Sequence, residues 1–260
     1  MNELYRQLID IVTENGFSDA DIRLINKAYD FACEQHKDMK RKNGEEYIVH
    51  PLSVAIIVAN LNTDVLTVVS ALVHEVVDHG SSSFEEIGEL FGTEVKDIVE
   101  SLTKVNRLHL IEYSESASLY LRKVLVALSK DARVIILKLA GRLHNLRTNE
   151  GLPPEKQKQK AMETWNVLIP IAHRLGINSV KSELEDLSFK YIKPEIYEEI
   201  ENELPAPREE LNKVLNEMMD DITELLVEND IKFEIKGRVK SVSSLHNKIS
   251  NCKKWQDIYD

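Results

Sequence analysis

Glycine and proline are scarce in this chain. Its 260 residues include 9 glycines and 7 prolines, about half of their usual combined share. This scarcity disfavours a turn-rich β-sandwich or β-barrel and favours long helices. The length is sufficient for one large domain or two modest ones with a buried core. The composition therefore predicts a mainly helical protein.

Cysteines and long apolar runs are also lacking. The only two cysteines, Cys33 and Cys252, are far apart, which fits neither a disulfide framework nor a thiolate metal site and predicts a reducing compartment. The first residues are charged, and the longest apolar stretches, 65–77 and 134–140, are too short to span a membrane. We therefore expect a cytoplasmic protein with no membrane contact.

Basic residues are fewer than acidic ones. The chain has 33 Lys and Arg against 44 Asp and Glu, a formal net charge of −11. Such a balance argues against a general nucleic-acid binder, and no direct DNA binding is expected. A polyanionic ligand would have to be held by a local basic patch or by a metal ion.

Helical periodicity runs through most of the first 190 residues. Ser18 is a predicted N-cap, and Pro51 suits a first helical turn, so that His50 falls at the start of a helix. Residues 39–48 interrupt the pattern as a basic loop, and residues 63–77 predict a core helix. Further helices are predicted at about 83–91, 93–106, 115–129, 131–149, 155–175 and 177–190.

The pattern changes after Tyr191. Three prolines within 192–208 indicate a boundary, and an amphipathic helix follows over about 211–226. Residues 231–235 alternate between apolar and charged side chains, which predicts a strand, and a last helix is predicted at about 241–251. Because one strand cannot form a sheet, this second unit is expected to be incomplete.

His74 and Glu75 interrupt the predicted core helix. An imidazole and a carboxylate among valines must be paired, shifted in protonation or bound to a metal. Together with His50 on the preceding helix they would suit a zinc, manganese or iron site. The alternative is a hydrogen-bonded core histidine, and the pattern alone does not separate the two.

Three other features could have either a chemical role or only a structural one. Asp78 and His79 could position a water or transfer a proton, or they could only end a helix. Gly141 costs roughly 1 kcal/mol in a helix interior, which close packing would explain. The basic run 40–42 could hold phosphate, or it could form a solvated surface.

Taken in order, six segments resemble the long RelA/SpoT-type enzymes, which make and degrade the alarmone (p)ppGpp. They are RKNGEEYIVHPLSVA, ALVHEVVDHG, FGTEVKDIVESLTKV, LKLAGRLHNLRT, IAHRLGI and KSELEDLSFKYI. The resemblance implies that residues 1–192 form an all-α helical bundle, an HD-type hydrolase domain built around one Mn²⁺. It implies that residues 193–260 form a linker and the incomplete start of an α/β synthetase, which transfers pyrophosphate from ATP to GDP or GTP.

The resemblance also exposes departures from the family. It assigns the four metal positions of the hydrolase to His50, His74, Glu75 and Gly141. The family has Asp at the last two, so the fourth ligand is missing and the third is longer by one methylene. The water-activating Glu-Asp pair of the family is Asp78-His79 here. The nucleotide-binding pattern is retained at Arg41, Lys42, Asn145 and Thr148.

These departures predict a hydrolase domain that has lost Mn²⁺ and activity, because a metal supplies several kcal/mol of transition-state stabilisation. The domain would regulate a synthetase and still bind a guanine nucleotide such as ppGpp, GDP or GTP. One alternative is a Mn²⁺-dependent guanosine-3′,5′-bis(diphosphate) 3′-pyrophosphohydrolase with an unusual ligand set. Another is an all-α interaction module in which these residues only pack the core.

The end of the chain resembles the ATP-binding part of the synthetase. The matching residues are Arg238, Lys240, Ser244, Lys248 and Asp260, the last at a Mg²⁺-binding position of the family. The rest of that site is absent, so Mg²⁺ is expected only in a complete synthetase. Contact with the ribosome is expected only through a full-length parent protein.

Overall fold

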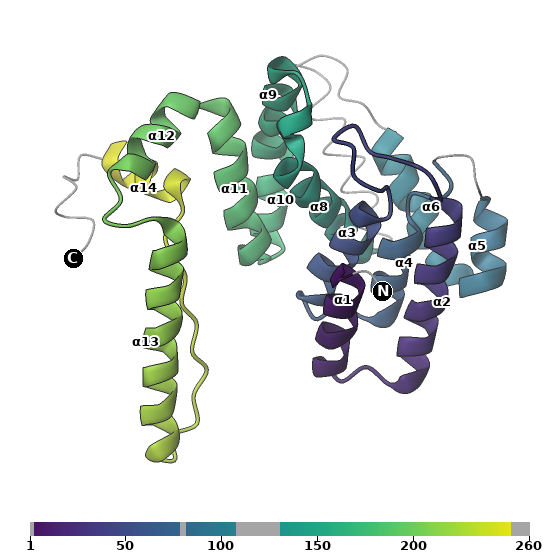
Figure 1. Cartoon of the computed structure of the whole chain (residues 1–260), viewed down its shortest axis with the longest axis horizontal. Coiled ribbons are helices and arrows are strands. Elements are labelled where there is room, and N and C mark those ends of the chain that lie inside the picture. Colours follow the sequence, from purple (N-terminus) through teal and green to yellow (C-terminus); the bar gives the residue numbers. More distant parts are fainter. Residues whose placement is uncertain (1–2, 79–81, 108–130, 251–260) are drawn as a thin grey trace.

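The computed structural model describes residues 3–78, 82–107 and 131–250, and within these ranges it is built from helices without a β-strand (Figure 1). The α-helices are α1 (Glu3–Glu14), α2 (Asp19–Gln35), α3 (Val49–Ala59), α4 (Val65–Val73), α5 (Phe84–Phe91), α6 (Thr93–Arg107), α8 (Ala132–Arg147), α9 (Pro154–Glu163), α10 (Ile169–Arg174), α11 (Asn178–Ile192), α12 (Pro194–Asn202), α13 (Arg208–Glu228) and α14 (Val242–Ser250). The predicted all-α class is confirmed.

Local sequence signals explain several helix starts. Ser18 caps α2, and its side chain accepts a hydrogen bond from the backbone N–H of Asp21 in a capping box. Ser83 caps α5, and its side chain accepts a hydrogen bond from the backbone N–H of Glu86. Pro51 lies in the first turn of α3, where its missing N–H costs no helical hydrogen bond.

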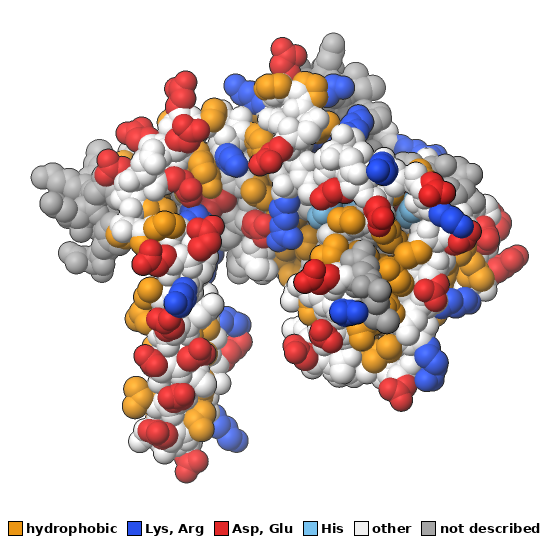
Figure 2. All heavy atoms as spheres, viewed as in Figure 1, with side chains coloured by type: hydrophobic (Ala, Val, Ile, Leu, Met, Phe, Trp, Pro, Cys, Tyr) orange, Lys and Arg blue, Asp and Glu red, His pale blue; other side chains and the backbone are white. Residues whose placement is uncertain are grey.

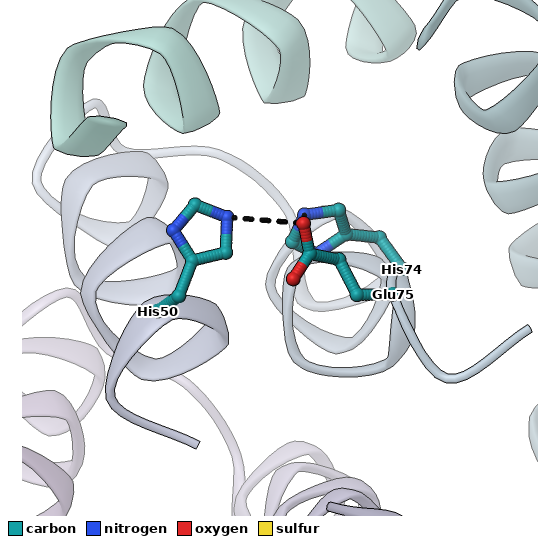
Figure 3. A group of neighbouring side chains, drawn as sticks. All are labelled: His50, His74 and Glu75. Atoms are coloured by element: carbon teal, nitrogen blue, oxygen red, sulfur yellow. Dashed lines mark ion pairs between the residues drawn. The ribbon is translucent and has the colours of Figure 1, made fainter. Parts of the chain in front are cut away.

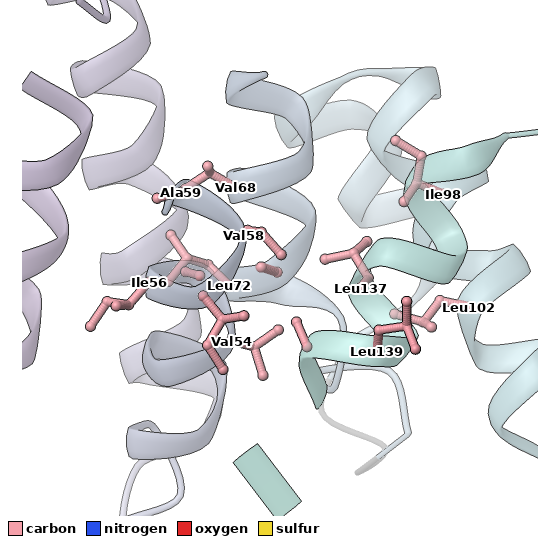
Figure 4. Packing of buried hydrophobic residues seen from close by; sticks show 14 of the residues in the cluster. Val54, Ile56, Val58, Ala59, Val68, Leu72, Ile98, Leu102, Leu137 and Leu139 are labelled. Atoms are coloured by element: carbon pink, nitrogen blue, oxygen red, sulfur yellow. The ribbon is translucent and has the colours of Figure 1, made fainter. Parts of the chain in front are cut away.

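The core surrounds α3 and α4, which pack against each other. Helix α3 also contacts α1 and α8, and α4 contacts α2 and α6. Apolar side chains from these helices, among them Val54, Leu72 and Leu137, interdigitate in the interior (Figure 4). Burial of a side chain of this size stabilises the fold by about 1.5–3 kcal/mol. The end of α4 is thereby held against the start of α3.

One helical stretch is locally widened. Residues Thr164–Leu168, between α9 and α10, form a π-helical turn. Pro170 follows directly, and because it lacks an N–H and its ring crowds the carbonyl four residues earlier, the regular α-helical pattern cannot continue there. The widened turn joins α9, which lines the candidate site, to α10.

The C-terminal helices have little core of their own. Phe189, Ile200, Val242 and Leu245 form a small buried cluster between α11, α12 and α14. Helix α13 projects away from the other helices (Figure 1), and no residue of it is buried. Its exposed apolar side chains lie among many acidic ones (Figure 2). They include Val214, Met218, Ile222 and Leu225.

Three expectations need comment. The strand predicted at 231–235 is wrong: this stretch is extended but forms no ladder, because no second strand pairs with it in the described ranges. The core helix predicted at 63–77 is shorter, starting at Val65 after the N-cap Asp64 and ending at Val73. The helix predicted at 115–129 lies outside the described residues.

None of the helices in the described ranges is long and apolar enough to cross a membrane.

Candidate functional site

Two buried histidines and a carboxylate meet where the start of α3 faces the end of α4 (Figure 3). His50 lies in the first turn of α3, and His74 is the C-cap of α4, followed by Glu75. Glu75 Oε1 lies 3.5 Å from His50 Nε2 and 3.9 Å from His74 Nε2. The fold thus brings together three of the four residues assigned to the metal positions.

The hydrogen bonds of the two imidazoles define their tautomers. His74 Nδ1 lies 2.7 Å from the carbonyl oxygen of Ala71, which can only accept, so this nitrogen carries the proton. His50 Nδ1 lies 2.8 Å from His144 Nδ1. Arg41 Nη1, which can only donate, lies 3.2 Å from the same nitrogen of His144. That nitrogen therefore accepts, His50 Nδ1 donates, and both Nε2 lone pairs face the carboxylate.

Burial keeps the imidazoles of His50 and His144 neutral. It lowers the pKa of His50 to about 3, and together with the charge of Arg41 it lowers the pKa of His144 to about 4. Neutral imidazole is the form that binds metals. Burial also raises the pKa of Tyr47, and so do the charge of Glu75 and a hydrogen bond to it. The phenol therefore remains a donor to the carboxylate.

The donor set fits a metal ion only in part. One donor atom from each of His50, His74 and Glu75 lies within 4.8 Å of the others, and two histidines with one glutamate are a zinc-type set. Manganese favours more oxygen ligands, and the predicted fourth position, Gly141, offers none. A Cβ built on Gly141 would meet no atom within 4 Å. Space for a carboxylate is present, but the carboxylate is not.

A cavity of about 260 Å³, here called the histidine-side cavity, opens beside these residues. Besides His50, His74 and Glu75 it is lined by Asp78, Leu102, Asn106, Leu137, Lys138, Gly141, Arg142, Asn145 and Lys160. Burial lowers the pKa of Lys138 to about 8, and its ammonium donates to Asn106 Oδ1 at 2.7 Å. The wall therefore carries three cationic side chains opposite two carboxylates.

Of the predicted water-activating pair, only Asp78 lies within the described residues. Asp78 lines the histidine-side cavity, but its Oδ1 also lies 3.0 Å from Arg107 Nη2. Its carboxylate is therefore engaged by a side chain of α6. His79 lies outside the described residues.

A second cavity of about 420 Å³, here called the loop-side cavity, lies beside the 39–48 loop. All four residues predicted to bind a nucleotide line it, namely Arg41, Lys42, Asn145 and Thr148. Arg41 Nη2 donates to Asn145 Oδ1 at 2.9 Å, which ties the loop to α8. Asn145 and Lys160 line both cavities, so the two adjoin.

Sequence reasoning missed several residues of this site. Lys138 and Arg142 were not predicted; they lie with the predicted positions Gly141 and Asn145 at helical spacing along α8, and all four line the histidine-side cavity. A polar row at positions 138, 141, 142 and 145 of an otherwise apolar helix is a signal that the sequence contains. Lys160 gives no such signal, because the helix that carries it, α9, is polar nearly throughout.

The residues assigned to the synthetase lie elsewhere. Arg238 Nη1 donates to Ser182 Oγ at 2.9 Å, and Ser244 Oγ accepts from Ser241 Oγ at 2.6 Å. Lys240 and Lys248 follow in the same stretch, and neither of the two cavities above includes any of the four. Asp260 lies outside the described residues.

Comparisons with known proteins identify relatives of this chain. Residues 28–178 match the HD domain family. The chain is 39% identical over 241 residues to a GTP pyrophosphokinase of Myxococcus xanthus, covering 90% of this chain and 31% of the relative. It is 41% identical over 239 residues to a guanosine-3′,5′-bis(diphosphate) 3′-pyrophosphohydrolase of Aquifex aeolicus, covering 91% of this chain and 34% of the relative.

A solved structure of a metazoan orthologue of SpoT that hydrolyses ppGpp has a similar fold. The TM-score is 0.53 at 22% identity, and the match covers 67% of this chain and 96% of that one. The chain spans about a third of the length of the curated relatives it matches.

Proposed function

The chain belongs to the HD domain family and is a RelA/SpoT homologue, and from this we propose that its HD domain is a guanine-nucleotide-binding regulatory domain with little or no hydrolase activity. The nucleotide is of the (p)ppGpp, GDP or GTP class. The observation that carries the proposal is the loop-side cavity, lined by the four residues predicted to bind a nucleotide, beside a metal cluster with a single carboxylate.

The nucleotide part of the proposal rests on the loop-side cavity. Arg41 and Lys42 contribute positive charge from the loop, and Asn145 and Thr148 contribute polar groups from α8 and its C-cap. Guanidinium groups bind phosphate through paired hydrogen bonds, and amides and hydroxyls recognise bases and sugars. A volume of about 420 Å³ is of the size that small-molecule sites have.

The loss of hydrolysis rests on the metal side. Gly141 removes one carboxylate ligand, which leaves Glu75 as the only oxygen donor of the cluster. Asp78 is held by Arg107, and the family's second acidic residue is replaced by His79. A metal site without its fourth ligand, beside an acidic pair reduced to one carboxylate, is poorly equipped to activate an attacking water.

We further propose that residues 1–192 are the HD domain and that residues 193–260 are a linker and the start of a synthetase domain in a longer cytoplasmic protein. The exposed apolar face of α13 would then be covered by the rest of that domain, in line with relatives about three times as long. The HD domain would restrain or release the synthetase. Contacts with Mg²⁺ and with the ribosome belong to that longer protein.

A second candidate is a metal-dependent (p)ppGpp pyrophosphohydrolase. The tautomers favour it, because the Nε2 lone pairs of His50 and His74 both face Glu75 and are available to a divalent ion such as Mn²⁺. A bound ion would lower the pKa of a water and neutralise charge on the leaving pyrophosphate. In this case Asp78 and His79 would serve the water.

Incubation of the purified chain with ppGpp and excess Mn²⁺ separates the two candidates. The measurement is pyrophosphate release, run beside the Aquifex aeolicus relative and a His74→Asn variant, with calorimetry to record ppGpp binding. The regulatory proposal expects binding without turnover above the His74→Asn control. Mn²⁺-dependent turnover that His74→Asn abolishes would establish the hydrolase instead, and absence of ppGpp binding would refute both.

A further inference from the structure

Lys160 lies on α9 at the junction of the two cavities and lines both of them. Its side chain is half-buried. Within the described ranges its ammonium makes no hydrogen bond and no ion pair. A half-buried cation that forms no direct ion pair is costly, because the charge of Glu163 offsets only part of the hydration that it gives up.

The charges around Lys160 are mainly positive. Burial lowers its pKa, the charges of Arg142 and Lys42 lower it further, and the charge of Glu163 opposes them. Arg142 is itself neutralised by Glu163, with 2.8 Å between Nη2 and Oε1, but no ion pair neutralises Lys42 in the described part of the chain. In a protein with a net charge of −11, such a junction is a local site of attraction for anions.

The carboxylates of the histidine-side cavity have partners of their own. Glu75 accepts a hydrogen bond from Tyr47. Asp78 is paired with Arg107. Neither forms an ion pair with Lys160, so the ammonium can bind a ligand that enters from either cavity.

We propose that Lys160 binds the diphosphate group of a nucleotide seated in the loop-side cavity, and that this contact needs no divalent metal ion. An ammonium supplies both a positive charge and three N–H donors, which suits a phosphate oxygen. Its position beside the incomplete metal site lets it neutralise charge that a metal ion would otherwise balance. The inference rests on the proposed nucleotide binding and deepens it.

The test measures binding by calorimetry in EDTA, with ppGpp, GDP, guanosine and free pyrophosphate as separate probes. Lys160→Met keeps the length of the side chain and removes the charge, and Lys160→Arg keeps the charge. Lys158→Met is the matched control, because Lys158 is an exposed lysine of the same helix. Thermal unfolding of each variant confirms that it folds.

The wild-type chain should bind ppGpp in EDTA, and Lys160→Met should weaken ppGpp binding by roughly ten- to hundredfold, the worth of one charge-assisted hydrogen bond. Lys160→Arg and Lys158→Met should stay near the wild type, and guanosine binding should be unaffected. Pyrophosphate binding that depends on Lys160 would show that the diphosphate alone is recognised, whereas binding of nucleotides only would show that the base is needed as well.

Two results would overturn the inference while leaving the proposed function intact. One is ppGpp binding that Lys160→Met does not change, and the other is ppGpp binding that requires Mn²⁺. If the wild-type chain binds no nucleotide with or without Mn²⁺, the proposed function itself fails.

Discussion

His50 Nδ1 donates a hydrogen bond of 2.8 Å to His144 Nδ1, which joins the first turn of α3 to the last turn of α8. The direction of this bond follows from Arg41, which donates to the same nitrogen of His144. Because the donor nitrogen of His50 is engaged there, its other nitrogen is unprotonated and faces Glu75. The nucleotide loop and the metal side of the site are therefore connected through one imidazole.

Replacement of His144 by Phe should destabilise the fold and weaken metal binding. The variant leaves the buried Nδ1–H of His50 without an acceptor, at a cost of about 1–3 kcal/mol in the free energy of unfolding. Loss of such an orienting partner lowers metal affinity by about tenfold or more. Urea unfolding at pH 7.5 and Zn²⁺ titration measure the two effects. His173→Phe, at an exposed histidine of α10, is the control and should change neither.

Stability should fall as the pH is lowered from 7 towards 4. The folded-state pKa values of His50 and His144, about 3 and about 4, lie below the ordinary value of 6.5. Below pH 6.5 the unfolded chain takes up protons that the folded chain does not, so stabilisation is full above pH 7 and is lost on acidification. Each histidine contributes a slope of up to about 1.4 kcal/mol per pH unit.

Urea unfolding between pH 7.5 and 5 tests this slope above the range in which most carboxylates titrate. A variant with both His50→Asn and His144→Asn should show a flatter profile over this interval. An equally steep profile in that variant would assign the acid sensitivity to other groups.

Gly141→Asp should strengthen Mn²⁺ binding by about tenfold or more, because it restores an oxygen donor where the cavity has room. Gly141→Asn has nearly the same shape without the charge, so the difference between the two isolates the carboxylate. Mn²⁺ titration followed by electron paramagnetic resonance gives both affinities. Equal affinities would mean that position 141 is not a ligand position in this fold.

Arg41→Met should weaken binding of ppGpp by about tenfold or more, because it removes a phosphate-binding guanidinium from the loop-side cavity. It should also raise the pKa of His144, since the charge of Arg41 contributes to lowering it. Calorimetry measures the first effect and NMR titration the second. Arg23→Met, at an exposed position of α2, is the control and should change neither quantity. If Arg41→Met changes neither the affinity for ppGpp nor the pKa of His144, the contacts of Arg41 with His144 and Asn145 do not have the role assigned to them.

The exposed apolar face of α13 should promote self-association of the isolated chain. Met218 is 55% exposed and Leu225 60% exposed, so the double substitution Met218→Glu, Leu225→Glu removes no buried contact. We expect it to reduce association in sedimentation experiments while the free energy of unfolding changes by less than about 0.5 kcal/mol. A large loss of stability would mean that α13 packs against other parts of the protein.

Much of the fold could be predicted from local sequence. The cap Ser18 and the position of Pro51 could be predicted because capping depends on residues within one turn. The predicted strand failed for the opposite reason. Alternation at 231–235 describes a side-chain pattern, whereas a strand needs a hydrogen-bonding partner elsewhere in the chain.

The sequence by itself determined the helical class, the departures at Glu75 and Gly141, and the residues available to bind a nucleotide, because these depend on residue identity and spacing. Only the tertiary structure decided which groups meet. The tautomer of His50, the ion pair that holds Asp78 and the place of Lys160 between two cavities all depend on helices distant in sequence. Hydrogen bonds and charge interactions act over a few ångströms, and no sequence spacing specifies those distances.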